Sequence, residues 1–362
     1  MVIIQIIPYL PPAISGVGDY ALNLAYQLHK DFDITTHFVV GDPNWQGSTH
    51  LEGFSISQVT KHSDAILLSL LPSNQATVLL HYVGYGYARR GCPFWLVEGL
   101  QQWCASGINK CLVTMFHEVY ASGLPWTSAF WLSPLQRKLA ACLTQISTHC
   151  FTSKQSYAEI LNTFSRSKNI SVTTLPIFST IGEPTQILPL AERSKRLVIF
   201  GSRGKRLRVY KECQEQLSKA CQLLEVEEIW DIGQPTGLAL SPVNNLTIVE
   251  KGQQPAKQIS CILLNSAAGL LDNNPNFLAK STIFAAYCAH GVLPIICRGS
   301  ALPTDGIELG KHYWVVDHRE RELPNKIDLQ QITNNAYSWY QTHNLSLQAN
   351  IYATHLKNQS SQ

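Results

Sequence analysis

The sequence predicts an α/β protein made of two doubly wound domains with mainly parallel sheets. Short continuous apolar runs alternate with longer helical patterns, the alternation stops once near the middle of the chain, and it then restarts. Strands that are buried on both faces of a parallel sheet give such continuous runs. The length of 362 residues also fits two domains better than one.

The expected strands of the first half are apolar runs of four to seven residues. They are Val2–Ile7, Ile34–Val40, Ala65–Leu70, Thr77–Tyr82, Cys111–Phe116 and His149–Thr152. Between the first two, the segment Asp19–Leu28 places Ala21, Leu24, Ala25 and Leu28 on one face of a helix. Alternation of strand and helix is typical of a doubly wound sheet.

A segment of proline, glycine and charge, from Pro176 to Arg196, interrupts the pattern and is typical of a linker. The later strands are expected at Leu197–Phe200, Glu228–Asp231, Thr247–Val249, Ile259–Leu264, Leu293–Cys297 and Tyr313–Val316. A last helix is expected over about Leu345–Leu356. We therefore expect two Rossmann-like domains facing across a cleft: residues 1–180, a linker at 181–196, residues 197–340, and a helical end at 341–362 that packs back on the first domain.

Composition excludes several classes of function. The 28 basic and 25 acidic residues leave a net charge of +3, too little for a typical nucleic-acid binder. Ten cysteines without a Cys-x-x-Cys pair predict reduced thiols and a cytoplasmic protein rather than a zinc site. No acidic pair suggests a metal site, and no cofactor is expected. No apolar run spans a bilayer, so only peripheral membrane contact stays open.

The first candidate site is the segment Ser15-Gly-Val-Gly-Asp-Tyr20, which follows the first strand and opens a helix. Gly16 and Gly18 let the backbone approach a ligand closely, and a helix N-terminus attracts anions. The dinucleotide-binding pattern is incomplete, because its third glycine is Ala21 here. A tight turn without any ligand is the alternative.

The second candidate is His117, which follows the buried run Leu112–Phe116 and precedes Glu118. A histidine at the end of a central strand is placed to meet a substrate. A structural histidine is the alternative. His81, at the end of another strand, is the next candidate.

Two further candidates lie in the second half. Arg203, Lys205 and Arg206 follow a strand in a glycine-containing loop and could neutralise a diphosphate. Lys280 and Ser281 lie at the start of a helix that ends at Gly291, with Ser281 as its cap. The alternatives are a solvated basic loop and a plain capped helix.

Together these motifs resemble retaining glycosyltransferases of the GT-B architecture, family four in particular. The resemblance covers almost the whole chain. It implies that Gly16, Gly18 and His117 serve the acceptor, and that the basic loop binds the donor diphosphate. From their place at a helix start, we infer Lys280 and Ser281 as a further contact to the donor diphosphate. One departure concerns the donor: aligned on Gly291, the two glutamates that the family carries are Leu278 and Ala286 here.

The resemblance implies transfer of a sugar from a nucleoside-diphosphate sugar to a sugar, glycan or lipid acceptor, with retention and without a metal or a protein nucleophile. Positioning and charge stabilisation would supply most of the catalysis. Two alternatives are a catalytically degenerate binding protein of the same fold and a sugar-nucleotide epimerase.

Overall fold

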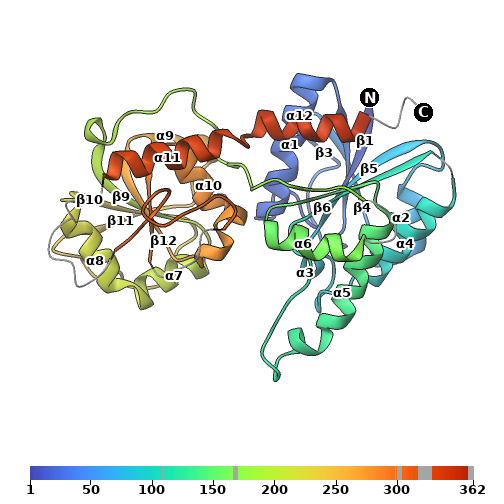
Figure 1. Cartoon of the computed structure of the whole chain (residues 1–362), viewed down its shortest axis with the longest axis horizontal. Helices are drawn as coiled ribbons and strands as arrows, with labels where there is room; N and C mark the ends of the chain where they lie inside the picture. Colours follow the sequence, from blue (N-terminus) through green and yellow to red (C-terminus); the bar gives the residue numbers. More distant parts are fainter. Residues whose placement is uncertain (108, 166–169, 298, 300–303, 317–327, 358–362) are drawn as a thin grey trace. The chain divides into compact units, whose positions relative to one another are not determined.

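The computed structural model describes residues 1–107, 109–165, 170–297, 299, 304–316 and 328–357. Contacts divide the chain into two compact units (Figure 1). Unit 1 comprises Met1–Pro176 together with Leu345–Gln362, and unit 2 comprises Ile177–Asn344. Among the described helices, none is long and apolar enough to cross a membrane.

Unit 1 is built on an eight-stranded sheet with the order β3-β4-β2-β1-β5-β6-β7-β8. All neighbouring strands are parallel except β3 and β4. The strands are β1 (Val2–Ile7), β2 (Thr35–Val40), β3 (His50–Leu51), β4 (Phe54–Gln58), β5 (Ala76–Tyr82), β6 (Lys110–Phe116), β7 (His149–Thr152) and β8 (Val172–Thr174). Because β1, β5, β6 and β7 run in the same direction, their carboxyl ends lie at one edge of the sheet.

The helices of unit 1 are α1 (Gly16–Phe32), α2 (Asp64–Leu70), α3 (Gly84–Tyr87), α4 (Phe94–Ala105), α5 (Ser128–Ile146), α6 (Gln155–Phe164) and α12 (Leu345–Lys357). α12 comes from the far end of the chain and packs beside α1 (Figure 1). The hydroxyl of Tyr20 on α1 donates to Oε1 of Gln348 (3.0 Å) and lies 3.2 Å from the hydroxyl of Tyr352. These buried bonds make the last described helix part of the core of the first domain.

Unit 2 is built on a parallel six-stranded sheet with the order β11-β10-β9-β12-β13-β14. Its strands are β9 (Ser194–Phe200), β10 (Glu228–Ile232), β11 (Ile248–Gly252), β12 (Ser266–Leu271), β13 (Leu293–Ile296) and β14 (Trp314–Val315). Its helices are α7 (Arg203–Glu212), α8 (Gln214–Leu223), α9 (Ala256–Leu264), α10 (Thr282–Ala289) and α11 (Leu329–Gln341), with 3₁₀ turns η1 (Leu190–Glu192) and η2 (Pro275–Lys280). The fold class expected from the sequence, two α/β domains with parallel sheets, is confirmed.

Two expected strands are wrong. Ala65–Leu70 belongs to helix α2 and Ile259–Leu264 belongs to helix α9. In α9 only Ile259 and Leu263 are buried, one turn apart on the same face, which is the helical period rather than that of a strand. A continuous apolar run alone does not separate a strand from a short buried helix.

The central strand β12 was not expected, because the first four residues of its sequence Ser-Ala-Ala-Gly-Leu-Leu are small and none is β-branched or aromatic. The structure gives the reason for the glycine in this strand. A Cβ atom on Gly269 would lie 2.5 Å from the ring of Tyr287, which packs from α10 onto the strand. The hydroxyl of Tyr287 donates to the carbonyl of Val198 on the neighbouring strand β9 (3.2 Å). Tyr287 therefore fills the volume that strand side chains would otherwise occupy.

Candidate functional site

A cationic pocket lies in unit 2 at the carboxyl ends of the adjacent parallel strands β9 and β12. Its volume is about 230 Å³. It is lined by Lys205, Asn273, Asn274, Phe277, Lys280 and Ser281, and none of these described residues is acidic. Ligands of parallel α/β sheets bind at this edge, so the pocket is in the position where the fold places a binding site.

The turn after β9 brings Lys205 to this pocket. Gly201 has φ +131, and a Cβ atom there would lie 2.3 Å from Cδ1 of Ile283, so the chain turns tightly into α7 only with glycine. α7 begins at Arg203, which places Lys205 in its first turn. The ammonium of Lys205 donates to Oδ1 of Asn273 (2.8 Å), which joins the end of β9 to the end of β12.

The other side of the pocket is the start of α10. Ser281 is the N-cap of this helix, as expected, and its hydroxyl accepts from the backbone N–H of Phe284 (3.3 Å). Lys280 immediately precedes the cap. The first N–H groups of a helix carry partial positive charge, which adds to the charges of the two lysines.

The electrostatic environment of the pocket favours an anion. Burial lowers the pKa of Lys205, the nearby Arg208 and Lys280 lower it further, and only Asp272 acts in the opposite direction. The Asp272 carboxylate in turn accepts from Nε of Arg208. A bound diphosphate would supply the negative charge that stabilises the protonated form of Lys205.

The structure separates Arg203 and Arg206 from this pocket. Arg203 donates to the carbonyl of Thr236 through Nε (3.1 Å) and Nη2 (2.8 Å), and so holds the segment that follows β10. Arg206 is 1% exposed and forms an ion pair with Asp231. It also donates to the carbonyls of Gly201 (2.9 Å) and Gln234.

The interpretation of Arg206 as a diphosphate ligand therefore needs correction. The three basic residues lie on the first turn of α7 rather than in a loop, and successive helix positions point in different directions. Arg206 faces the core, where it balances the buried carboxylate of Asp231. Of the three, only Lys205 lines the pocket.

In unit 1 the two glycines in the first turn of α1 have different surroundings. Ser15 caps α1, and its hydroxyl accepts from the N–H of Gly18 (3.2 Å). A Cβ atom on Gly18 would lie 2.4 Å from the carbonyl oxygen of Tyr9, so packing alone requires glycine there. A Cβ atom on Gly16 would meet nothing within 4 Å, so the protein's own packing gives no reason for glycine at this position.

His117 follows the end of β6 and is 7% exposed. Its Nε2 lies 3.2 Å from Nδ1 of His81, and Nε2 of His81 lies 2.9 Å from Oε1 of Gln5. Gln5 in turn donates to the hydroxyl of Thr36 (3.0 Å). The chain of bonds crosses the neighbouring strands β2, β1, β5 and β6.

This arrangement orients the imidazole of His117. Burial lowers the pKa of His81 to about 3, so His81 is neutral at physiological pH. Its Nε2 donates to Gln5, which leaves Nδ1 as the acceptor for the Nε2–H of His117. The ring of Tyr20 packs edge-on against His117, with centroids 5.1 Å apart.

Sequence reasoning missed Asn273, Asn274 and Phe277. They follow β12, the strand that was not expected, so their position at the sheet edge was not visible. The cluster Asp272-Asn-Asn-Pro275 is a turn signal and could have indicated the end of a strand.

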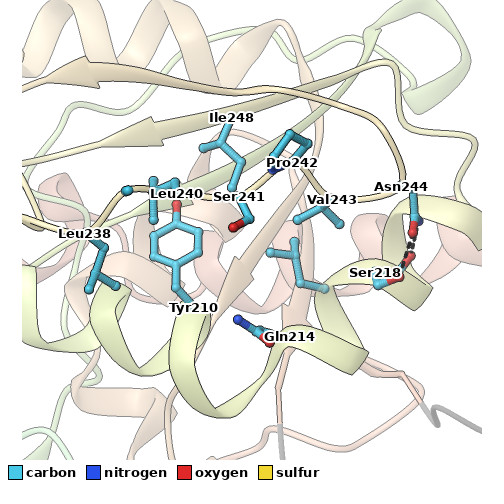
Figure 2. Close-up of a pocket in the computed structure, with 12 residues that line it drawn as sticks. Tyr210, Gln214, Ser218, Leu238, Leu240, Ser241, Pro242, Val243, Asn244 and Ile248 are labelled. Carbon is cyan, nitrogen blue, oxygen red and sulfur yellow. Dashed lines mark hydrogen bonds between the residues drawn. The ribbon is translucent and has the colours of Figure 1, made fainter.

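A second pocket in unit 2, of about 270 Å³, lies between α7, α8 and the segment from β10 to β11 (Figure 2). Its lining residues are all uncharged. Ser218 and Asn244 hydrogen-bond to each other at one end, as Figure 2 shows. The hydroxyl of Tyr210 donates to Oδ2 of Asp231. Without a charge to neutralise a phosphate, this pocket is the weaker candidate for the ligand expected here.

Neither the models of known protein families nor the curated proteins match this sequence. Solved structures do match in fold. The pneumococcal O-GlcNAc transferase GtfA in complex with UDP and GlcNAc is 10% identical with a TM-score of 0.64, over 100% of this chain and 99% of that chain. The lipopolysaccharide outer core galactosyltransferase WaaB is 14% identical with a TM-score of 0.57, over 99% of each chain.

A third similar structure is an α,α-trehalose-phosphate synthase (UDP-forming) from Burkholderia xenovorans in complex with glucose-6-phosphate. It is 10% identical with a TM-score of 0.60, over 98% of this chain and 99% of that chain. At such identities the likeness establishes the fold and not the activity. The chain has the two-domain GT-B fold, which these glycosyltransferases share.

Proposed function

We propose that the protein transfers a sugar from a nucleoside-diphosphate sugar to a sugar, glycan or lipid acceptor. The cationic pocket carries the proposal: two lysines and a capped helix start lie together where the fold binds ligands, with no acidic lining residue among those described. The names of the similar structures, which include complexes with UDP and with GlcNAc or glucose-6-phosphate, support the same class of ligand.

In the proposed reaction the donor diphosphate binds at Lys205, Lys280 and Ser281 in unit 2. The lysines, rather than a metal ion, neutralise the charge that develops on the leaving diphosphate. The acceptor binds in unit 1 near Gly16, Gly18 and His117. With its Nε2–H donated to His81, neutral His117 uses Nδ1 to accept a hydrogen bond from a sugar hydroxyl. It need not remove a proton, because in a retaining transfer the leaving phosphate takes the proton of the acceptor.

Nucleoside-diphosphate binding tests the donor site. Lys205→Met and Lys280→Met should each weaken binding of UDP or another nucleoside diphosphate by about 1.5–3 kcal/mol, the value of a charge-assisted hydrogen bond. Lys211→Met is a matched control, because Lys211 is exposed on the same helix as Lys205 but does not line the pocket. Unchanged affinity in both pocket variants, measured by calorimetry, would rule out the site.

A catalytically silent binding protein is the second candidate. The observation that favours it is that the two glutamates are missing. In the alignment on Gly291 their positions are taken by Leu278 and Ala286, which are 1% and 0% exposed. Slow hydrolysis of a nucleotide sugar, measured as release of the nucleoside diphosphate, would support the transferase over the binding protein. Binding without any release, over a panel of nucleotide sugars and acceptors, would favour the binding protein.

A further inference from the structure

An uncharged stretch of 18 residues, Val119–Gln136, separates Glu118 from Arg137 and Lys138. Residues 121–135 of this stretch comprise a loop and the first turns of α5. We call these residues the arm. Figure 1 shows the arm extending away from the sheet of unit 1. α5 continues behind it into the core, where Leu139, Ala140 and Leu143 are buried.

The arm exposes large apolar side chains. Trp126 is 79% exposed and Trp131 72%, and Leu124 and Phe130 are exposed beside them. Tryptophan is costly to leave in water because it has the largest apolar surface of all side chains. Several such residues together mark an interaction surface rather than scattered exposure.

The arm is ordered by its own hydrogen bonds and by a fixed base. The hydroxyl of Thr127 caps α5 by accepting from the N–H of Phe130 (3.3 Å), and it donates to the carbonyl of Leu124 (2.7 Å). At the base the buried Gln136 accepts from the N–H of Ala121 (2.8 Å) and donates to the carbonyl of Arg90 (3.0 Å). The apolar side chains are therefore held on a defined support.

Four basic residues lie on the two segments that form this base. Arg89 and Arg90 are exposed on the segment that Gln136 binds, and Arg137 and Lys138 are exposed on α5 directly after it. In the two segments involved, residues 83–98 and 117–138, the only carboxylates are Glu98 and Glu118. The base of the arm thus carries an excess of positive charge next to an uncharged aromatic tip.

We propose that the arm docks on an anionic lipid bilayer, with Trp126 and Trp131 in the interfacial layer and the four basic residues at the headgroups. Tryptophan side chains concentrate at the membrane interface, and basic residues near the surface bind anionic lipids. The positive charge at the base of the arm favours an anionic bilayer over a second copy of the chain. A symmetric contact between two arms would bring the same basic groups face to face.

Vesicle binding by the complete protein tests the proposal without any donor or acceptor, so its outcome is independent of the transferase assignment. The probes are phosphatidylcholine vesicles with and without phosphatidylglycerol, and the same vesicles with brominated acyl chains. We expect binding to the anionic vesicles, weakening with added salt, and quenching of tryptophan fluorescence by the brominated lipid. Absence of binding by the wild-type protein would overturn the proposal.

Paired variants locate the contact. Trp126→Ser/Trp131→Ser should lower vesicle affinity at least about tenfold, since each exposed aromatic loses its apolar transfer free energy. Val249→Ser/Leu309→Ser, at exposed apolar residues of unit 2, should not change it. Arg137→Gln/Lys138→Gln should lower affinity about fivefold for each charge removed, whereas Lys211→Gln/Lys257→Gln, at exposed lysines of unit 2, should have a much smaller effect.

Two results would contradict this assignment. Equal vesicle binding by the tryptophan variant and the wild type would place the lipid contact elsewhere. A wild-type dimer in light scattering that becomes a monomer in the tryptophan variant would assign the arm to a second copy of the chain. Thermal unfolding of each variant confirms that it is folded, and brominated-lipid quenching in the wild type gives a readout that needs no substitution.

Discussion

The imidazole of His117 is oriented by that of His81, whose Nδ1 lies 3.2 Å from Nε2 of His117. His81 is fully buried and neutral, and its Nε2–H donates to Oε1 of Gln5, so its Nδ1 accepts in the bond with His117. The two side chains come from the neighbouring strands β5 and β6, with Gln5 of β1 fixing the other side of His81. The bond to His81 fixes the role of Nε2 and the orientation of the His117 ring. A ring fixed in this way is better placed to hydrogen-bond to a ligand than one that rotates freely.

His117→Ala should lower turnover of the nucleotide sugar by about ten- to a hundredfold, the effect of losing a hydrogen bond and leaving its partner unsatisfied. Affinity for the nucleoside diphosphate, which we assign to unit 2, should stay unchanged. His117→Gln should restore part of the turnover, because its amide N–H can still donate to His81. Normal kcat in the alanine variant would remove His117 from the proposed site.

Gly16→Ala and Gly18→Ala should differ sharply. Gly18→Ala should destabilise the fold by about 1–3 kcal/mol, because the new methyl group clashes with the carbonyl of Tyr9. Gly16→Ala should leave the unfolding free energy unchanged or raise it slightly, while raising KM for the acceptor if the open space above Gly16 receives it. Denaturant unfolding and steady-state kinetics of both variants check this, and an unchanged KM in Gly16→Ala would argue against an acceptor contact.

Arg206→Met should destabilise the protein by about 3–5 kcal/mol, since it leaves the buried carboxylate of Asp231 without its cation. Adding Asp231→Asn should recover part of the loss. Lys211→Met, at an exposed position of the same helix, should have little effect on stability. If Arg206→Met folded with normal stability but failed to bind nucleoside diphosphates, the role of Arg206 would be in the ligand site after all.

Acid should destabilise the protein through its buried histidines. Burial lowers the pKa of His81 to about 3 and those of His149, His290 and His343 to about 4, below the ordinary value of 6.5. Between pH 6.5 and 4, these histidines therefore bind more protons in the unfolded chain than in the folded protein. The stability from these groups is complete above pH 6.5 and is lost as pH falls through that range, by at most about 1.4 kcal/mol per pH unit for each histidine.

Urea unfolding at several pH values measures this slope. His149→Gln should reduce the slope, because one group with a lowered pKa is removed. His50→Gln should not, because His50 is exposed. Equal slopes for the wild type and His149→Gln would show that His149 is not responsible for any of the pH dependence.

Much of the sheet pattern could be predicted from the sequence, because strands such as β1 and β6 are short and mainly apolar runs. β12 could not, since its Gly269 makes room for the ring of Tyr287, which is a tertiary contact. The cap at Ser281 depends only on local sequence and was predicted correctly. The different surroundings of Lys205 and Arg206 depend on where Asp231 and Asn273 come to lie, which neighbouring residues in the chain do not determine.

The position of α12 has a consequence for synthesis of the protein. Tyr20 bonds to Gln348 and Tyr352, and both of these residues follow it by more than 300 positions in the chain. On the ribosome the first domain therefore emerges with the face of α1 that α12 covers still open to water, while the whole of unit 2 is being translated. Of the two units, unit 1 therefore begins to be translated first but is completed last, because its final packing step waits for α12.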